Sequence, residues 1–390
     1  SPAVNPAAED TPNHEPLQTG EIRDVERFRE LRPTWNRLVE ASRFPSVFLR
    51  HEWFDAALQW ASPRRSPLIL TFSEGEAVVA VMPLSLQQPS LPGSGPVRLE
   101  ALQVPDTQEF DLIARAGREG AACEAFARWL VRNRRHWDTL HLSALPSRSG
   151  MAGRLRHALA GTGIAVAPEE EKTNLSIDLT QPWESYYQGL SRRLKKNNNL
   201  IQNRLEKATG ARLLWYRTLD AESQPLERAI AVSARSWKSP LGLSLDFPGP
   251  GRFVRRLADH GAREGWLSLW LLELDGEAAA MELQLAYGGR VHALRGDFDP
   301  DFESLSPGSY LHHHQLRSLF EEKDLTTYLM GPGPNPYKLR WSGKGETLRA
   351  LRAWSPTWRG TLARLYDLRL WPAARRAKAV VTNRKKKEGA

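Results

Sequence analysis

Two short turns separate three apolar runs in the second half of the chain, and they constrain the fold more than any other feature. The runs cover 266–274, 277–287 and 291–295, and the turns between them are Asp275-Gly276 and Gly288-Gly289. Two-residue Asp-Gly and Gly-Gly turns between apolar runs are strong hairpin signals, because glycine readily adopts the positive φ that such turns need. The pattern therefore predicts a three-stranded antiparallel meander.

The order of the other predicted elements indicates two similar units. The chain has 390 residues, whereas a single hydrophobic core usually stops growing at roughly 250–300. A predicted hairpin over 68–86 is followed by a helix at 119–134 and a strand at 139–143. After the meander, the second half repeats this order with a helix at 309–322 and a strand at 326–330. Each half therefore predicts an α/β (α+β) unit with a mainly antiparallel sheet and flanking helices.

Shifts in composition place the expected boundaries. Residues 1–20 are rich in proline, alanine and acidic residues without an apolar period, so we expect them to be disordered. An N-terminal domain is expected over 21–168, a C-terminal domain over 169–355 and a basic helical tail over 356–390. The remaining predicted segments are helices at 22–38, 48–60, 151–160, 182–208 (interrupted near Gly189), 225–238 and 253–264, and a loop at 240–251.

The net charge of +9 is concentrated in two segments. Residues 359–390 contain ten Lys and Arg against two acidic residues, and residues 190–210 contain six against one. The remainder of the chain is therefore mildly acidic. Because proteins that follow duplex DNA spread positive charge along a face of the fold, this distribution argues against a duplex DNA partner.

Cysteine content and apolar runs limit the cellular setting. Cys123 is the single cysteine, which excludes an intramolecular disulfide and a cysteine-based zinc site and is typical of a reducing compartment. The longest apolar runs, such as 267–272 and 77–82, are far shorter than the roughly 20 residues that cross a bilayer. We therefore expect a cytoplasmic protein, or one that lies peripherally at the inner face of the membrane.

Five motifs in the second half resemble those of one protein family. They are Leu190-Ser-Arg-Arg-Leu-Lys-Lys-Asn, Ser236-Trp237-Lys238, Phe298-Asp-Pro-Asp, Leu305-Ser-Pro-Gly308 and Gly331-Pro-Gly-Pro-Asn-Pro-Tyr337-Lys338. Their order and spacing resemble the CelD-like acetyltransferases, GNAT-superfamily proteins of bacterial cellulose and exopolysaccharide loci that are related to Fem-type peptidyltransferases. The resemblance covers about residues 20–355 and implies two tandem GNAT-like domains, with the acyl donor in the C-terminal one.

This resemblance implies an acyltransferase that uses acetyl-CoA or another acyl-CoA and needs no metal. The implied acceptor is an amine or hydroxyl of a sugar, or of a nucleotide-linked or lipid-linked sugar, in exopolysaccharide or cellulose production. Two alternatives stay open. One is a Fem-like transferase that takes an aminoacyl group from charged tRNA, and the other is a non-catalytic GNAT-like scaffold on a membrane polysaccharide synthase.

The candidate donor site is the turn Ser306-Pro307-Gly308-Ser309, which leads into the helix expected from Tyr310. A helix N-terminus offers unpaired N–H groups and a partial positive charge, and glycine lets a pyrophosphate approach the backbone. The Gln/Arg-x-x-Gly-x-Gly/Ala phosphate loop usual in the superfamily is absent, and this turn stands in its place. The same residues also fit an ordinary helix cap with proline in the first turn.

The candidate bases lie on the predicted meander. Counting back from the Gly288-Gly289 turn pairs Glu282 with Arg295 and places both on one face of the sheet with Asp297. Acyl transfer needs a base that removes the acceptor's proton, and we expect Asp297, or else Glu282, to serve. The alternative is a cross-strand Glu282–Arg295 ion pair without a chemical role. Tyr337 is the expected proton donor to the leaving thiolate.

Acceptor contacts are expected from several segments. The helix over 190–207 has a basic face, which suits either a solvated surface or a phosphate-bearing acceptor. Other candidates come from the resemblance motifs and from the residues after the Gly/Pro motif. The candidate acceptor-binding residues are Arg192, Arg193, Lys195, Lys196, Trp237, Lys238, Arg295, Lys338 and Arg340.

The histidine run His312-His313-His314 does not predict a metal site. Consecutive residues of a helix point about 100° apart, so three in a row cannot converge on one ion.

The tail has the pattern of an amphipathic helix. Apolar residues recur at helical spacing among arginines from Trp358 to Leu370, and the sequence Arg384-Lys-Lys-Lys387 follows. Such a helix either lies on an anionic membrane, where it could meet a polysaccharide synthase, or packs on the body of the protein ahead of a disordered end.

Overall fold

The computed structural model describes residues 15–60, 62, 64–208, 210–219 and 224–370. The N-terminal half contains β1 (Gln18–Ile22), α1 (Val25–Glu30), α2 (Arg32–Glu40), α3 (His51–Leu58), β2 (Arg65–Glu74), β3 (Ala77–Gln87), β4 (Arg98–Ala101), β5 (Ile113–Ala114), α4 (Glu119–Arg132), β6 (Thr139–Pro146), α5 (Met151–Leu159) and β7 (Ala165–Val166). The C-terminal half contains β8 (Glu170–Asp178), α6 (Trp183–Gln188), α7 (Arg192–Ala208), β9 (Ala211–Tyr216), α8 (Gln224–Arg235), α9 (Pro248–Glu264), β10 (Leu267–Leu274), β11 (Glu277–Tyr287), β12 (Arg290–Phe298), η4 (Pro300–Leu305), α10 (Pro307–Glu321), β13 (Thr327–Pro332) and α11 (Pro336–Leu339). They are followed by β14 (Gly345–Trp354), α12 (Trp358–Leu365) and the π-helical turn η5 (Tyr366–Leu370).

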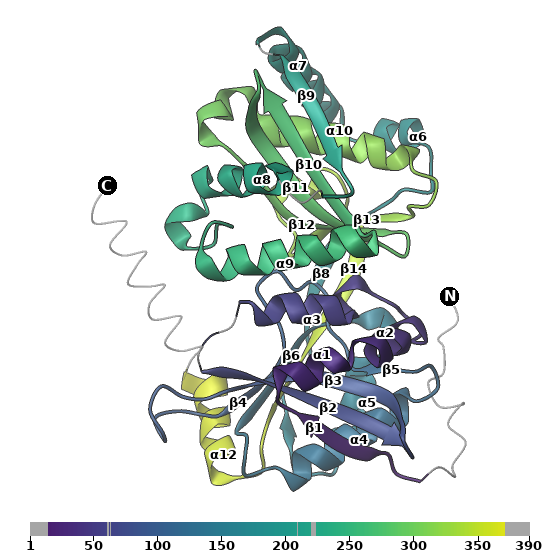
Figure 1. Cartoon of the computed structure of the whole chain (residues 1–390), viewed down its shortest axis with the longest axis vertical. Helices are drawn as coiled ribbons and strands as arrows, with labels where there is room; N and C mark the ends of the chain where they lie inside the picture. The colour runs from purple at the N-terminus through teal and green to yellow at the C-terminus, as the bar shows by residue number, and fades with distance from the viewer. Residues whose placement is uncertain (1–14, 61, 63, 209, 220–223, 371–390) are drawn as a thin grey trace.

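The described strands form one sheet that runs through both halves. Its main path has the order β1-β2-β3-β4-β6-β14-β8-β13-β12-β11-β10-β9, with β5 beside β3 and β7 beside β14. β14 lies between β6 and β8 and is antiparallel to both, so the last strand among the described residues joins the two halves. Figure 1 shows the halves one above the other, with β8 and β14 where they meet. The α/β class and the mixed sheet flanked by helices are confirmed.

The meander is confirmed as β10, β11 and β12, which pair antiparallel in sequence. Both of its turns use positive φ angles, for example 87° at Gly276 and 78° at Gly289. β10 and β11 also contribute apolar residues to both faces of this sheet, where they pack against α10 on one side and against α8 and α9 on the other.

The predicted register of the meander is wrong beyond one point. A β-bulge between Leu283 and Gln284 shifts the pairing of β11 with β12 by one residue. As a result Glu282 lies opposite Gly296, and Arg295 lies opposite Leu283. Because side chains alternate along a strand, Arg295 points to the other face from Glu282, and the predicted Glu282–Arg295 pair does not form.

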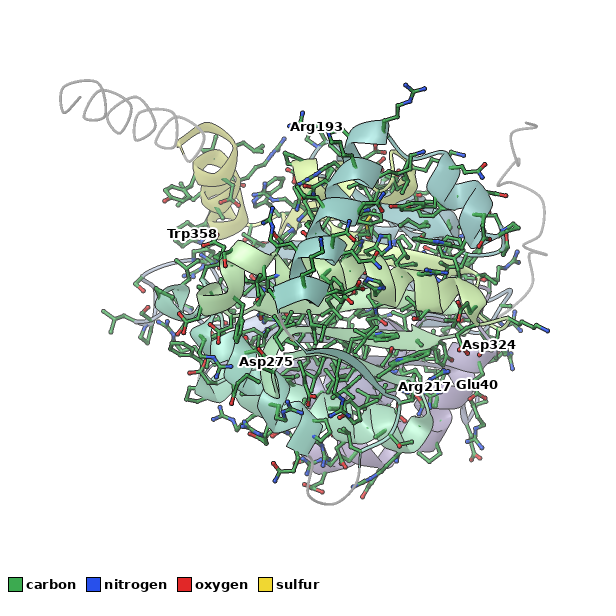
Figure 2. The ribbon with its side chains drawn as sticks, turned by 90° about the horizontal axis from the view of Figure 1, so that it is seen from above. Glu40, Arg193, Arg217, Asp275, Asp324 and Trp358 are labelled. Carbon is green, nitrogen blue, oxygen red and sulfur yellow. The ribbon has the colours of Figure 1, made fainter. Side chains whose placement is uncertain are left out.

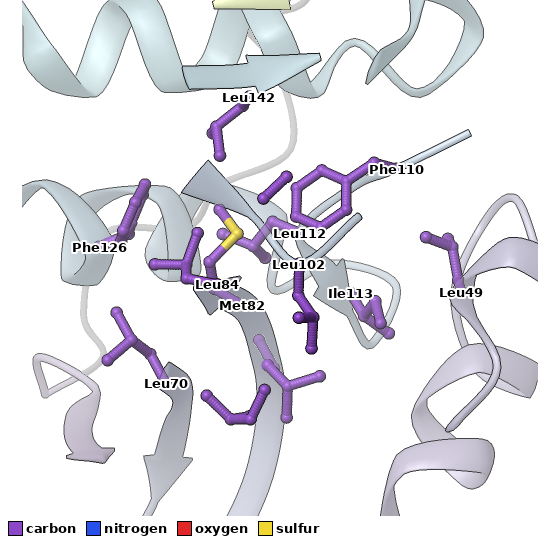
Figure 3. Close-up of a cluster of buried hydrophobic side chains, with 14 of the residues drawn as sticks. Leu49, Leu70, Met82, Leu84, Leu102, Phe110, Leu112, Ile113, Phe126 and Leu142 are labelled. Atoms are coloured by element: carbon purple, nitrogen blue, oxygen red, sulfur yellow. The ribbon is translucent and has the colours of Figure 1, made fainter. Parts of the chain in front are cut away.

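The N-terminal half is built around one large apolar cluster (Figure 3). Leu70, Met82 and Leu84 from the β2–β3 hairpin meet Phe126 of α4 and Leu142 of β6 in this cluster. The cluster also includes Phe253 and Leu257 of α9, so the two halves share a packed core as well as a sheet.

Several elements differ from the predictions. The helix expected over 22–38 is the pair α1 and α2, and residues 18–20 begin β1 rather than the disordered segment expected over 1–20, of which 1–14 lie outside the described residues. α9 begins at Pro248, inside the expected loop at 240–251, and β14 was not expected. Of the tail, residues 371–390 are outside the described part. No helix among the described residues is long and apolar enough to span a membrane.

Candidate active site

A cavity opens where two parallel strands of the C-terminal half diverge. β12 and β13 pair only over Arg290–His292 and Thr327–Leu329, and β12 then continues without β13 beside it. The cavity that begins at this divergence has a volume of about 740 Å³, within the range of small-molecule sites. Its walls come from β11, β12, α10 and α11, and from the Pro105–Gln108 loop of the N-terminal half.

The N-terminus of α10 forms one end of the cavity. Ser306 precedes the helix with a φ of 54°, makes no capping hydrogen bond through its side chain, and is followed by no acidic residue in the first turn. The first N–H groups of α10 are therefore available to an anion. Gly308 and Ser309 line the cavity. A Cβ at Gly308 would lie 3.4 Å from the ring of Phe298, so the backbone is closely packed on that side.

The other two donor-site candidates do not line the cavity. Ser306 holds the turn before α10, and Tyr310 packs its ring against His314 at a centroid distance of 4.2 Å. Of the predicted donor residues, the structure therefore brings Gly308 and Ser309 to the cavity.

Glu282 is held in the cavity wall by a buried hydrogen-bond network. Its Oε1 accepts hydrogen bonds from the Tyr328 hydroxyl at 2.5 Å and from Gln284 Nε2 at 3.1 Å. Gln284 in turn accepts a hydrogen bond from the Trp270 indole and donates one to Gln315 of α10. Burial, and then the neighbouring Glu282, raise the pKa of Tyr328, so its hydroxyl remains a donor at neutral pH. The network fixes the position of the Glu282 carboxylate.

His312 is a candidate functional residue, although the histidine run had been weighed only as a metal site and rejected. Its Nδ1 lies 3.9 Å from Glu282 Oε2, and its buried Nε2 has no hydrogen-bond partner among the residues that the structure describes. The side chain lines the cavity one helical turn after Gly308. The i, i+4 spacing from Gly308 was a usable signal, because it places both residues on the same face of a helix. His313 packs against Trp183 instead.

Asp297 lies in the cavity wall but is paired with a cation. Its Oδ1 is 2.6 Å from Lys238 Nζ, and the same Nζ donates a hydrogen bond to the carbonyl oxygen of Gly296 at 3.0 Å. Arg295, on the same face of the sheet, donates to Asp106 of the N-terminal half at 2.7 Å. Burial raises the pKa of Asp106, an effect that Arg295 opposes. These four charges compensate one another on one side of the cavity.

Tyr337, from the short helix α11, approaches the cavity from the other side. Its ring lies 5.5 Å from that of His312, and burial raises its pKa, so the phenol is protonated at neutral pH. Lys338 lines the cavity and donates to the carbonyl oxygens of Gly331 and Gly333. Arg340 is not part of the lining and stacks on the Tyr337 ring at 5.4 Å.

The structure does not bring the basic start of α7 to this cavity. Arg192, Arg193, Lys195 and Lys196 are absent from its lining, and Lys195 donates to the carbonyl oxygen of Gln188. The opposite end of α7 is the one near α10, because Arg204 hydrogen-bonds to Ser304. Arg193 is exposed at the outer surface (Figure 2). Trp237, by contrast, lines the cavity with 62% of its surface exposed.

Residues 192–339 match the family described as Acetyltransferase (GNAT) domain. This stretch of the C-terminal half is therefore similar to a GNAT acetyltransferase domain. The match includes α10, His312, Glu282 and Tyr337, and it supports the predicted enzyme class, an acyltransferase. GNAT domains use acyl-CoA, and the uncapped start of α10 suits the pyrophosphate of such a donor.

Solved structures with the same fold cover nearly the whole chain. FemX superposes with a TM-score of 0.54 and 11% identity, over 85% of this chain and 96% of FemX. L-PGS from Bacillus licheniformis gives 0.51 and 13%, over 89% and 95%. The C-terminal domain (DUF2156) of a putative lysylphosphatidylglycerol synthetase from Agrobacterium fabrum gives 0.50 and 11%, over 84% and 92%. No curated protein matches the chain in sequence. With the repeated order of elements, these likenesses show a fold of two tandem GNAT-like units.

Proposed function

We propose that this protein transfers an acyl group, most simply acetyl, from acyl-CoA to an amine or hydroxyl of a sugar or sugar-linked precursor in exopolysaccharide or cellulose production. The observation that carries the proposal is the opening between β12 and β13, which has an uncapped helix N-terminus at one end and the Glu282–His312 pair in its wall. The CelD-like resemblance of the sequence motifs supports the choice of a sugar acceptor.

The donor would be held by backbone groups. Gly308 and Ser309 of the first turn of α10 line the cavity, and the helix dipole favours the negative charge of a pyrophosphate there. Past His292, no described strand pairs with β12 on its cavity side, although Gln108 occupies the Ala293 carbonyl oxygen there. An extended chain with amide groups would lie along the rest of this edge. Both features bind the donor without a phosphate-loop arginine.

The side chains around the cavity supply the proton transfers. His312 Nε2 has no partner and would accept the proton of the acceptor's O–H or N–H as that atom bonds to the acyl carbon. Glu282, near Nδ1, would stabilise the resulting imidazolium. As the C–S bond breaks, the Tyr337 hydroxyl would donate a proton to the sulfur. Asp297 remains a candidate base, although Lys238 compensates its charge.

The acceptor would enter beside the exposed Trp237. An indole packs against the apolar C–H face of a sugar ring, and Lys172, Lys238 and Lys338 line the same cavity. These lysines would suit the phosphate of a nucleotide-linked or lipid-linked sugar.

A second candidate function is a Fem-like transfer from aminoacyl-tRNA. The observation that favours it is the row of cations at the start of α7, where Arg192, Arg193 and Lys196 are exposed and no acidic residue lies in the first turn. A row of this kind suits the phosphate backbone of a nucleic acid.

The cellular setting follows from the same proposal. We place the protein in the cytoplasm, with residues 359–390 at the inner face of the membrane near a polysaccharide synthase. Deleting 359–390 should abolish sedimentation with anionic vesicles at low salt and leave soluble activity intact. Failure of the full chain to bind such vesicles would contradict this placement.

Isothermal titration separates the two candidate functions. Under the acyl-CoA function, the full chain binds acetyl-CoA or a longer acyl-CoA. Under the tRNA function, it ignores CoA and binds charged tRNA through α7. No detectable heat or displacement at millimolar acyl-CoA would overturn the first function. Measuring the turnover of Asp297→Asn and His312→Gln then identifies the base. The variant that lacks the true base should lose most of the transfer activity.

A further inference from the structure

A second cavity, of about 450 Å³, lies in the N-terminal half between α12 and the sheet. The sheet face below α12 is made of β4, β6 and β14, which are neighbours in that order. α12 does not seal this face, because Trp358 is 72% exposed and Leu362 is 55% exposed although both line the cavity. Figure 2 shows α12, with Trp358 labelled, at the edge of the molecule. We call this cavity the α12 groove.

The floor of the α12 groove is a regular array of polar and aromatic side chains. Residues paired across neighbouring strands point to the same side of a sheet. The pairing of β6 with β4 and with β14 therefore gives two rows of three on the groove side. The rows are Arg98, Thr139 and Trp354, and Glu100, His141 and Arg352, all of which line the cavity.

The roof of the groove is apolar and is held in place by polar contacts at its edges. Trp358, Leu362 and Tyr366 recur at helical spacing and line the cavity. Arg359 forms an ion pair with Asp138 at 3.2 Å, which holds the start of α12. Farther along, Asp367 accepts a hydrogen bond from the indole of Trp354. The apolar stripe therefore faces an open groove, although the helix is anchored to the body.

The charges in the groove balance. Its lining contains three arginines and three carboxylates, which are Arg98, Arg352, Arg359, Glu100, Asp138 and Asp367. Burial, and then Arg352, lower the pKa of His141, so the imidazole is neutral at pH 7. Within the described residues, the side chains of Arg98 and Glu100 form no hydrogen bond or ion pair, although Glu100 raises the pKa values of Arg65 and His141 through its charge. Both side chains can therefore hydrogen-bond to a ligand.

We propose that the α12 groove binds a neutral oligosaccharide. Sugars present apolar C–H faces together with hydroxyl groups, which suit the aromatic roof and the polar rows of the floor respectively. An anionic ligand would meet the three carboxylates, and a wholly apolar ligand would bury Arg98 and Glu100 without partners. The groove is separate from the cavity between β12 and β13 and goes beyond the proposed transferase function, since it would hold a sugar chain without reacting with it.

The test uses the full chain and cellohexaose as the probe, measured by isothermal titration without CoA. Trp358→Ala should weaken cellohexaose binding by about tenfold or more, as the loss of an exposed aromatic anchor usually does. Arg98→Ala and Glu100→Gln should each weaken it by about three- to tenfold. Leu200→Ala is the control, because Leu200 of α7 is a 54% exposed apolar residue that lines neither cavity, and it should leave cellohexaose affinity unchanged.

Three results would overturn the groove proposal. The first is no heat with cellohexaose from a folded chain, and the second is equal affinity in wild type, Trp358→Ala and Arg98→Ala. The third is Trp358-dependent binding to vesicles of phosphatidylglycerol and phosphatidylcholine in place of the sugar. Acetyl-CoA binding is measured in parallel. A chain that binds cellohexaose through Trp358 but ignores acyl-CoA would refute the proposed transferase and support the groove.

Discussion

The two halves of the molecule have the same pair of parallel strands, but only one pair leaves an opening. In the C-terminal half, β12 and β13 separate after three residue pairs and a cavity begins there. In the N-terminal half, β4 and β6 also pair over three residues, but the segment 102–112 fills the space beyond them. Phe110 and Leu112 of this segment lie in the core beside Leu142 (Figure 3). We call residues 102–112 the closing segment.

Hydrogen bonds attach the closing segment to β6. Gln103 and Ser143 exchange two, one from Gln103 Nε2 to the Ser143 carbonyl oxygen at 2.9 Å and one from the Ser143 hydroxyl to Gln103 Oε1 at 2.7 Å. The Phe110 N–H donates to the carbonyl oxygen of Ala144. These hydrogen bonds occupy the backbone edge of β6. Without the closing segment, this edge would face an opening like the one beside β12.

The N-terminal turns of α4 and α10 also differ between the closed and the open half. α4 begins with Glu119, a buried carboxylate that accepts hydrogen bonds from the Gly117 N–H at 2.8 Å and from Arg43 at 2.9 Å. A second anion at this helix start would be repelled. α10 has no acidic residue in its first turn. The comparison teaches that one half has the features of a donor site, whereas the other has the same frame closed by its own side chains.

The closed half also contributes to the open one. From the closing segment, Asp106 pairs with Arg295, and Gln108 donates to the carbonyl oxygen of Ala293 at 2.7 Å. Both residues line the cavity of the C-terminal half. The closed half therefore builds one wall of the cavity in the open half.

The largest effect is expected from a change in the open half. His312→Gln should lower turnover by roughly 10²–10⁴-fold, because it removes the proposed general base without emptying the cavity. His314→Gln is the matched control on the same helix, since His314 packs on Tyr310 outside the cavity, and it should keep near wild-type turnover. Steady-state kinetics with unchanged thermal unfolding check the prediction. Equal turnover in both variants would contradict it.

Acid should weaken the contact that ties the closing segment to both halves. The Glu109 carboxylate pairs with Arg148 at 2.9 Å and with Arg290 at 3.3 Å. Burial alone would raise its pKa, but His292 and the two arginines outweigh burial and lower the pKa to about 2. Against an ordinary value near 4.5, this corresponds to about 3 kcal/mol of stability.

The sign follows from the lowered pKa. The stabilisation is fully present above about pH 4.5 and is lost as the pH falls toward 2, since the unfolded chain binds the proton more tightly. Glu109→Gln should therefore remove about 3 kcal/mol at pH 7 and flatten the acid limb of the stability curve, as measured by urea unfolding. Glu26→Gln, which breaks an exposed pair with Arg29, should change stability by less than about 0.5 kcal/mol. Equal losses in the two variants would refute this account.

One substitution in the first turn of α10 and one in the first turn of α4 compare the two helix N-termini directly. Gly308→Val should weaken acetyl-CoA binding by about 1–3 kcal/mol, the cost of losing one or two hydrogen bonds to a charged group. Glu119→Gln, at the start of α4, should leave acetyl-CoA affinity unchanged, because that helix lies in the closed half. Calorimetric titration of both variants measures the difference. If Glu119→Gln weakened the donor as much as Gly308→Val, the donor would not belong to the open half alone.

What the sequence predicted depends on the range of each contact. The meander was predictable because Asp275-Gly276 and Gly288-Gly289 are local turn signals. β14 was missed because it is held in the sheet by pairing with β6 and β8, which are both far away in the sequence. The register error has a similar cause, since the bulged stretch of β12 is held at Ala293 by Gln108, 185 residues earlier.

The residues of the candidate site also differ in whether local sequence or distant contacts determine their positions. Gly308 and Ser309 were predictable from the turn before a helix, which is a local feature. The pairing of Asp297 with Lys238, and of Arg295 with Asp106, joins segments that are distant in sequence. The basic start of α7 was assigned to the acceptor from its charge alone, whereas its position depends on how α7 packs against α10.

The smallest effect is expected at this basic start of α7. A helix of 17 residues is about 25 Å long, and the end that meets η4 and the start of α10 is the one that carries Arg204. Replacing Lys195 and Lys196 together by alanine should therefore change acetyl-CoA affinity by less than about 0.5 kcal/mol, as surface substitutions usually do. Any loss should fall on the affinity for a phosphate-bearing acceptor and grow weaker with salt. Calorimetry with acetyl-CoA and kinetics with the acceptor at two salt concentrations measure both effects. Loss of all transfer together with loss of tRNA binding would mean that this face, rather than the opening between β12 and β13, recognises the donor.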